Sequence, residues 1–328
     1  MNTEKIFTLA PHNLKKALRH ELIHLGYNER CVHNKKDFLY AEGDAPYMLV
    51  AHLDTVHQQL PSIICYSKDG NYMMSPQGIG GDDRCGVYII LSLLNKLSFK
   101  PYIVFTMDEE IGGLGATAFV NYMKDYDVPE LKYIVEYDRK GDNDCVFYRC
   151  DNKDFVDFVE QFGFKKSFGT FSDISIIAPN FNVAAVNLSS GYYNPHTNYE
   201  YVSFGAMSNV IEQSIKMLET ECEAFEYIEE KIEIQKYNRS AYDIEVFATP
   251  IPQGTVWVYD WMLEDYRGNY EDELVIDEFG VVYKYTPYCE DYIRTGNLKY
   301  VDDDETLLAT YDANNVIPVQ IYNYKTNV

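Results

Sequence analysis

The chain has 328 residues, of which 46% are hydrophobic, and its 28 basic and 51 acidic residues give a formal net charge of −23. So acidic a chain lacks the basic surface that sequence-independent binding of nucleic acid requires. The same charge disfavours docking on an anionic membrane. The hydrophobic content suffices for a folded core and excludes intrinsic disorder. The composition therefore predicts a folded protein that binds neither nucleic acid nor membranes.

The N-terminus, MNTEKIFTLAPHNLKK, has no basic patch followed by an apolar run and a cleavage site, so we expect no signal peptide. The longest mainly apolar stretch, residues 86–94, is far shorter than the ~20 residues of a membrane span. The Cys count is odd, and the sequence has no C-x-x-C pair. Free thiols in a reducing compartment explain this pattern best. A cytoplasmic location is the resulting expectation.

The first part of the chain alternates between helical and strand periodicities. Helices are expected at residues 14–25, 85–97, 114–122, 155–162 and 204–218. Strands are expected at residues 38–41, 47–51, 102–106, 133–137, 146–148 and 183–188. This alternation predicts an α/β layer with a largely parallel centre, whose binding sites lie at the carboxyl ends of strands.

The composition changes near residue 223. Residues 224–328 hold 21 acidic and 8 basic residues, 14 of the 30 Tyr and both Trp. Short β-branched or aromatic runs predict strands at 242–247, 255–259, 274–276, 281–285 and 319–322, with a hairpin turn at 277–280. We therefore expect an α/β domain at 1–223 and a small β-rich domain at 224–328. The aromatic residues of the second domain would form its core, gate substrate, or mediate self-association or binding of a protein partner.

Five segments carry residue types that bind metal ions, and each ends or follows an expected strand. Zinc takes imidazole and carboxylate ligands, and two ions ~3.5–4 Å apart share one carboxylate. Such a site also needs a free carboxylate that accepts a proton from water. For any single segment a solvated acidic loop is the alternative, but five together favour a two-metal site. The segments are 52–54 (HLD), 82–84 (DDR), 108–110 (DEE), 136–138 (EYD) and 195–196 (PH).

The sequences MLVAHLDTVH, GGDDRCG, TMDEEIGG, EYDRKG and NPHTNYEYV, in this order, resemble the ligand motifs of the co-catalytic zinc exopeptidases. This clan includes peptidase T, carboxypeptidase G, succinyl-diaminopimelate desuccinylase, aminoacylase and compact aminopeptidases. The resemblance covers residues 45–205. It implies a three-layer α/β/α sandwich with a mixed, mostly parallel sheet. It also implies a metal-dependent exopeptidase or amidohydrolase that cleaves an amide beside a free terminus.

Carried over residue by residue, the resemblance implies a role for each motif. Glu109 would be the general base, and Asp54 would hold the imidazole of His52. Asp82 would bridge the two ions, because the ligand in the clan precedes a basic residue by two positions and Arg84 is that residue; Asp83 is the alternative. Zinc is the expected metal, with manganese or cobalt as alternatives. The metal ligands would be His52, Asp82, Glu110, Asp138 and His196.

Less specific roles remain open for these residues. Asp54 could cap a turn, Asp138 could pair with Arg139, and His196 could be an ordinary loop histidine. Glu109 and Glu110 could be an acidic pair at a helix N-terminus. Three basic residues near the expected ligands could receive a substrate carboxylate or form surface ion pairs. They are Arg84, Arg139 and Lys140.

A second metal motif is present near the N-terminus. Residues 20–24 read HELIH, the H-E-x-x-H pattern in which two His bind zinc. The positions expected for its extended form hold Tyr27 and Arg30 instead of Gly and His, and only 19 residues precede it. We therefore interpret residues 20–24 as a solvated or partly packed face of an amphipathic helix.

Between Asp138 and His196 the chain has 57 residues (196 − 138 − 1). This interval is too short for the inserted domain that larger clan members use to dimerise and cover substrate. Its segments FGTFSD and AAVNLSSGYYNPH resemble the compact aminopeptidases. Two other functions stay open: an N-acyl amino acid deacylase with the same site, and an inactive binding or assembly protein that keeps the fold.

Overall fold

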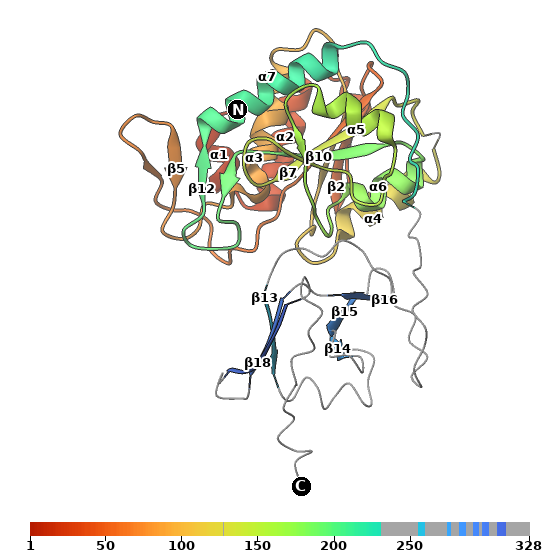
Figure 1. Cartoon of the computed structure of the whole chain (residues 1–328). Helices are drawn as coiled ribbons and strands as arrows, with labels where there is room; N and C mark the ends of the chain where they lie inside the picture. The colour runs from red at the N-terminus through yellow and green to blue at the C-terminus, as the bar shows by residue number, and fades with distance from the viewer. Residues whose placement is uncertain are drawn as a thin grey trace. The chain divides into compact units, whose positions relative to one another are not determined.

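The computed structural model describes residues 1–126 and 128–230 and six strands of the C-terminal part (Figure 1). Contacts divide the chain into two compact units, Met1–Glu230 and Lys231–Val328. All five motif segments lie in the first unit. No helix among the described residues is long and apolar enough to cross a membrane.

The first unit is built on an eight-stranded sheet with the order β1-β2-β6-β3-β7-β10-β8-β9. Its four central strands, β6, β3, β7 and β10, run parallel, and antiparallel pairs flank them on both sides. The chain leaves β3 for β6 on one side and returns to β7 on the other, so the strand order reverses at β3. The bounds are β1 Val32–Asn34, β2 Phe38–Ala41, β3 Tyr47–His52, β6 Tyr102–Thr106, β7 Tyr133–Arg139, β8 Asp144–Val146, β9 Lys165–Lys166 and β10 Ala185–Ser189.

Helices cover both faces of this sheet, which confirms the predicted three-layer sandwich (Figure 1). In β3, Leu49 and Ala51 face one hydrophobic cluster, whereas Met48 and Val50 face the other, as the two-residue period of a strand requires. The first face packs against α1 (Thr3–Thr8), α2 (Pro11–His24), α3 (Gly81–Leu94), α5 (Lys153–Glu160) and α7 (Phe204–Glu219). The second face packs against α4 (Leu114–Met123) and α6 (Ile174–Phe181).

Most expected elements of the first unit are present, with shifted ends. The expected helix at 85–97 begins earlier, at Gly81, and contains non-helical backbone at Asp82 and Asp83. The short helices α1 and α6 and the 3-10 turn η1 (Glu29–Cys31) were not predicted. Helix α6 contains Pro179, which reads as a helix breaker in sequence. Between Asp138 and His196 the chain contributes β8, β9 and β10 to the main sheet and α5 and α6 to the helices that cover it.

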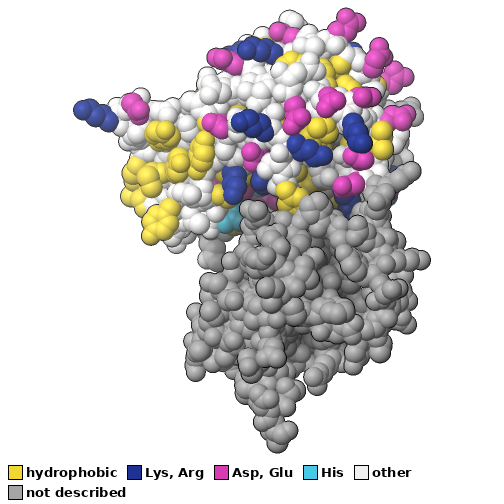
Figure 2. All heavy atoms as spheres, in the orientation of Figure 1, with side chains coloured by type: hydrophobic (Ala, Val, Ile, Leu, Met, Phe, Trp, Pro, Cys, Tyr) yellow, Lys and Arg dark blue, Asp and Glu magenta, His cyan; other side chains and the backbone are white. Residues whose placement is uncertain are grey.

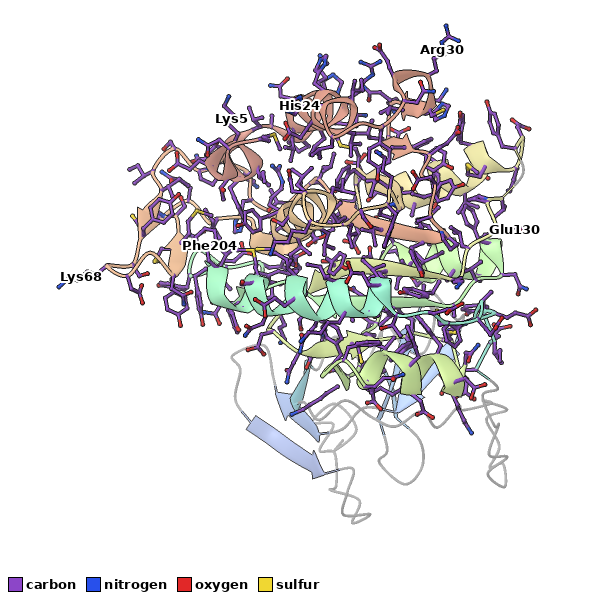
Figure 3. The ribbon with its side chains drawn as sticks, turned by 90° about the horizontal axis from the view of Figure 1, so that it is seen from above. Lys5, His24, Arg30, Lys68, Glu130 and Phe204 are labelled. Atoms are coloured by element: carbon purple, nitrogen blue, oxygen red, sulfur yellow. The ribbon has the colours of Figure 1, made fainter. Side chains whose placement is uncertain are left out.

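A smaller four-stranded sheet, β11-β12-β5-β4, lies beside the main one. Its strands have two or three residues, too few for a readable period, and were not predicted. Hydrophobic side chains gather on the surface at this sheet (Figure 2), and Lys68 marks the tip of the β4–β5 hairpin (Figure 3). A cavity of about 400 Å³ is lined in part by Tyr66, Tyr72 and Tyr201. The bounds are β4 Cys65–Tyr66, β5 Tyr72–Met74, β11 Tyr192–Tyr193 and β12 Tyr201–Ser203.

The described strands of the second unit form two three-stranded sheets, β13-β17-β18 and β14-β15-β16. The expected strands at 255–259 and 274–276 are β13 and β14, and the one at 281–285 is shifted by one residue. The expected strands at 242–247 and 319–322 and the turn at 277–280 lie outside the described residues. The bounds are β13 Thr255–Tyr259, β14 Leu274–Ile276, β15 Val282–Thr286, β16 Asp291–Arg294, β17 Asn297–Val301 and β18 Leu307–Asp312.

Residues 224–230 are joined to the first unit. Phe225 donates its backbone N–H to Lys132, and its carbonyl accepts from Ala184. The Phe225 ring lies 5.0 Å from the ring centroid of Phe155 and 5.3 Å from that of Phe158. A domain boundary placed at residue 223 would therefore separate this aromatic cluster from its last member.

We expect a chain of residues 1–230 to fold cooperatively and a chain of residues 1–223 to be less stable, because the shorter one lacks Phe225. In the full chain, Phe225→Ala removes the same ring. Core Phe→Ala changes cost ~3–5 kcal/mol, and the ring is half-buried, so about 2 kcal/mol of unfolding free energy should be lost. Urea denaturation measures the loss. Phe168→Ala, at an exposed position, is the control, and an equal loss in both variants would contradict the role of the cluster.

Candidate metal centre

The five motif segments meet at the carboxyl ends of the parallel strands. His52 is the last residue of β3, Asp138 lies near the end of β7, and Glu110 follows β6 in a turn. Asp82 opens α3, and His196 lies in the loop between β11 and β12. The structure thus brings together residues up to 144 positions apart (196 − 52). This is the edge at which α/β sheets bind ligands.

One group of ligand atoms comes from His52, Asp82 and Asp138, and these atoms all lie within 4.8 Å of one another. Nε2 of His52 is 3.1 Å from Oδ1 of Asp82 and 3.5 Å from Oδ1 of Asp138. The imidazole is completely buried. A single ring nitrogen therefore faces two carboxylates at once, although it carries at most one proton.

A second group consists of Asp82, Glu110 and His196, again with ligand atoms within 4.8 Å of one another. Nε2 of His196 is 3.2 Å from Oδ2 of Asp82 and 3.3 Å from Oε2 of Glu110. The other oxygen of Glu110 is buried without a hydrogen-bond partner among the described residues. The His196 side chain is 53% exposed, so this group opens to solvent.

These distances fit metal ions. A zinc ion holds nitrogen and oxygen ligands at ~2.1 Å, so two ligand atoms of a tetrahedral ion lie about 3.4 Å apart. The four histidine–carboxylate distances range from 3.1 to 3.5 Å. Each group offers three protein ligands and leaves a coordination position for water or substrate. The residues present therefore suit two divalent ions that share Asp82.

Asp54 lies behind His52 and organises its surroundings. Its Oδ1 is 3.4 Å from Nδ1 of His52, and its Oδ2 accepts the backbone N–H of Glu110 at 3.1 Å. Burial by itself would raise the pKa of Asp54, but the interactions with His52 and with the backbone N–H groups of Glu110 and Glu109 together outweigh it and lower the pKa to about 2. Asp54 is therefore ionised at neutral pH and orients both a ligand and the turn that carries Glu109 and Glu110.

Glu109 lies close to this charge without joining either ligand group. Burial raises its pKa to about 9, and the negative charges of Asp138, Asp173 and Glu110 act in the same direction. Burial likewise raises the pKa of Asp138, to about 7. Cations placed among these carboxylates would lower both values, which is a further reason why the site suits divalent ions.

The alternative ligand Asp83 has a different environment. Its Oδ1 accepts the backbone N–H of Gly86 at 2.9 Å, and the residue is completely buried. Burial, followed by the charge of Asp138, raises its pKa far above the usual range. The peptide bond between Asp82 and Asp83 is cis. Asp82 and Asp83 have different partners, and only Asp82 belongs to the ligand groups.

Both roles left open for Arg84, a receiver of a substrate carboxylate and a surface ion pair, are wrong, because the side chain is buried. Arg84 is 1% exposed, and its guanidinium donates to the carbonyls of Ile6, at 2.5 Å, and Leu9, at 3.0 Å. Burial lowers its pKa to about 10. Arg84 therefore ties α3 to the end of α1. Of the other two candidates, Arg139 lies 3.5 Å from Asp144, and Lys140 is exposed.

The HELIH motif lies on α2, away from these ligand groups. His20 and His24 are exposed, and Figure 3 places His24 in the helical layer outside the sheet. Glu21 pairs with the amino group of Met1. Neither His20 nor His24 joins a group of three metal-binding side chains among the described residues. The structure therefore agrees with a solvated helix face.

Several buried polar residues beside the ligands were not singled out from the sequence. Ser172 donates to Glu136 and, at 3.2 Å, to Asp138, while Asn187 donates to the carbonyl of Asp138. Glu200 accepts three hydrogen bonds around Asp82. Ser172 and Glu200 lie inside the quoted segments FGTFSD and NPHTNYEYV, so position in a motif was the signal available.

No protein-family model matches the chain, and no curated protein matches it in sequence. Solved structures do match it. The aminopeptidase PepT from Bacillus cereus ATCC 10987 covers 65% of this chain and 93% of its own, at 15% identity and a TM-score of 0.50. A tripeptidase from Staphylococcus aureus subsp. aureus Mu50 covers 66% of this chain and 98% of its own, at 14% identity and a TM-score of 0.49. The first match confirms the expected fold, which this chain shares with the aminopeptidase PepT.

We expect Asp82→Asn to lower the zinc content of dialysed protein far more than Asp83→Asn. Asp82 contributes an oxygen to each group, whereas Asp83 contributes none. An amide is also a close substitute for the buried, high-pKa carboxyl of Asp83. Elemental analysis of the two purified variants makes the comparison, and the double variant His20→Ala/His24→Ala is the control. Equal zinc loss in both Asp variants would make Asp83 a ligand.

Proposed function

We propose that the chain is a metal-dependent hydrolase that cleaves the amide bond next to a free terminus of a peptide or small amide. Two divalent ions, zinc by preference, would be held by the two ligand groups. His52, Asp82 and Asp138 would hold the first ion, and Asp82, Glu110 and His196 the second. In this proposal the chain is an aminopeptidase-like exopeptidase.

One observation carries the proposal: two imidazoles converge on the two oxygens of a single carboxylate. Oδ1 of Asp82 faces His52 at 3.1 Å, and Oδ2 faces His196 at 3.2 Å. A carboxylate with a ligand partner on each oxygen is the arrangement that a pair of bridged ions requires. A cluster held together only by hydrogen bonds would not require an imidazole on each oxygen of the carboxylate.

The reaction follows from the positions of the chain's own groups. The chemistry supplied by two bound divalent ions is a lowered water pKa, toward ~7, and a polarised substrate carbonyl. Glu109, outside the ligand groups, takes a proton from the attacking water and returns it to the leaving amine. Asp54 fixes the His52 ring and accepts the N–H of Glu110, which holds the adjacent Glu109 in place.

The two alternative functions, an inactive relative and an N-acyl amino acid deacylase, predict different properties of the same site. An inactive relative that kept the fold would be expected to have lost ligands or the base. This chain retains His52, Asp82, Glu110, Asp138 and His196 together with Glu109, which favours an enzyme. An N-acyl amino acid deacylase would use the same residues on a substrate with a blocked amine, so the substrate separates it from an exopeptidase.

Glu109→Gln should keep both ions and lose turnover. Gln has nearly the same shape but cannot accept the proton, and loss of a general base costs roughly 10²–10⁴ in rate. Glu110→Gln is the matched comparison, because it removes a ligand and should lose metal as well. Zinc content and hydrolysis rate are measured for both variants. Near-normal hydrolysis by Glu109→Gln would refute its role as base.

A panel of dipeptides with free and acetylated amino groups tests the substrate class. We expect cleavage of substrates with a free amino terminus and at least tenfold slower cleavage of the acetylated forms, a difference of about 1.4 kcal/mol in barrier. Glu109→Gln, which keeps the ligands, measures the background from contaminating peptidases. Preference for the acetylated forms would support the deacylase instead, and cleavage of neither by the zinc-loaded chain would refute the proposed function.

A further inference from the structure

Glu200 is a fully buried carboxylate at the centre of the loops that carry Asp82 and His196. It is 1% exposed and pairs with no Lys or Arg among the described residues. Its Oε1 accepts the backbone N–H of Asp82 at 3.0 Å. Its Oε2 accepts the backbone N–H of Gly80 at 2.9 Å and faces Nε2 of His57 at 2.8 Å. A buried polar group is retained only where its partners compensate for the loss of water. Two of the three partners, Gly80 and Asp82, lie at the start of α3, and the third, His57, lies in the segment that follows β3.

The same residue anchors the loop of His196. The side chain of His196 is half exposed, so packing alone holds it weakly. The loop is instead closed by its own hydrogen bonds, from Thr197 Oγ1 to the carbonyl of Asn194 at 2.8 Å and from the Glu200 N–H to the carbonyl of Thr197 at 3.1 Å. Glu200 therefore joins this loop, through its side chain, to the backbone of Asp82.

Glycines allow the close approach that this arrangement needs. A Cβ on Gly81 would lie 3.2 Å from Oε1 of Glu200 and 2.7 Å from side-chain atoms of Tyr192 and Val202. A Cβ on Gly78 would lie 2.2 Å from the ring of His57. Any larger residue at these two positions would push the loop away from His57 and Glu200.

We propose that Glu200, held by His57, is a positioning residue that sets the second metal site, formed by Asp82, Glu110 and His196. This inference rests on the proposed two-metal function. The first site depends on Glu200 less, because His52 and Asp138 are fixed by the adjacent parallel strands β3 and β7. Loss of Glu200 should therefore weaken binding of the ion in the second site more than binding of the ion in the first site.

The substitution Glu200→Gln tests this. An amide has one acceptor oxygen, so it cannot accept from both sides, and its NH2 group would face the N–H of Asp82 or of Gly80. Zinc is titrated into the apo form of the full chain by calorimetry. Changes to groups that orient ligands cost 10–100-fold in metal affinity. We expect one of the two zinc ions to lose 10–100-fold in affinity and the other to change by less than about threefold.

Glu130→Gln is the matched control, because Glu130 is exposed at the edge of the first unit (Figure 3). His57→Ala removes only one of the three partners and should weaken the same ion by a smaller factor. If Glu200→Gln fails to fold, the zinc titration of His57→Ala still tests the inference. Equal weakening of both ions, no weakening in either variant, or fewer than two zinc ions on the unmodified chain would overturn the inference. The titration requires no hydrolysis, so failure of the proposed reaction is detected separately.

Discussion

The central constraint on this protein is the concentration of buried negative charge around one carboxylate, Asp82. His52 and His196 face its two oxygens, and Asp138 and Glu110 complete the two ligand groups. Burial of so many acidic groups is unfavourable unless positive charge compensates for it. Arg84, the nearby buried cation, is engaged with the carbonyls of α1. Divalent ions are the compensation that the donor set suits best, and the surrounding hydrogen bonds are arranged around that need.

The parallel strands of the fold bring these ligand side chains together. The parallel strands β3, β6 and β7 end at the same edge, so the residues at or just after their ends converge. Rigid strands supply His52 and Asp138, whereas the first turn of α3 supplies Asp82, and loops supply Glu110 and His196. The ligands outside the strands therefore require additional anchoring. Asp54 and Glu200 provide it through hydrogen bonds to backbone N–H groups.

The division into two units has a functional consequence. Every proposed ligand and the proposed base lie in Met1–Glu230, and residues 224–230 still pack against Phe155 and Phe158. The chemistry is thus assigned to the first unit. The strongly acidic, Tyr-rich second unit is left as a candidate for gating or for binding a partner. The apolar surface on the sheet β11-β12-β5-β4 belongs to the first unit and adjoins the His196 loop in sequence.

The sequence by itself determined the α/β layer and predicted the five side chains that the structure brings into two potential ligand groups. Strands such as 38–41 and 102–106 are short, mainly apolar runs typical of a buried sheet, and ligand residue types recurred after strands. It did not determine β4, β5, β11 or β12, because strands of two or three residues have no readable period. Nor did it separate Asp82 from Asp83 by residue chemistry or show that Arg84 is buried. Only the tertiary structure decided these points, because they depend on contacts between residues far apart in the chain. The hydrogen bond between Glu200 and Asp82, for example, spans 118 residues and leaves no local pattern in the sequence.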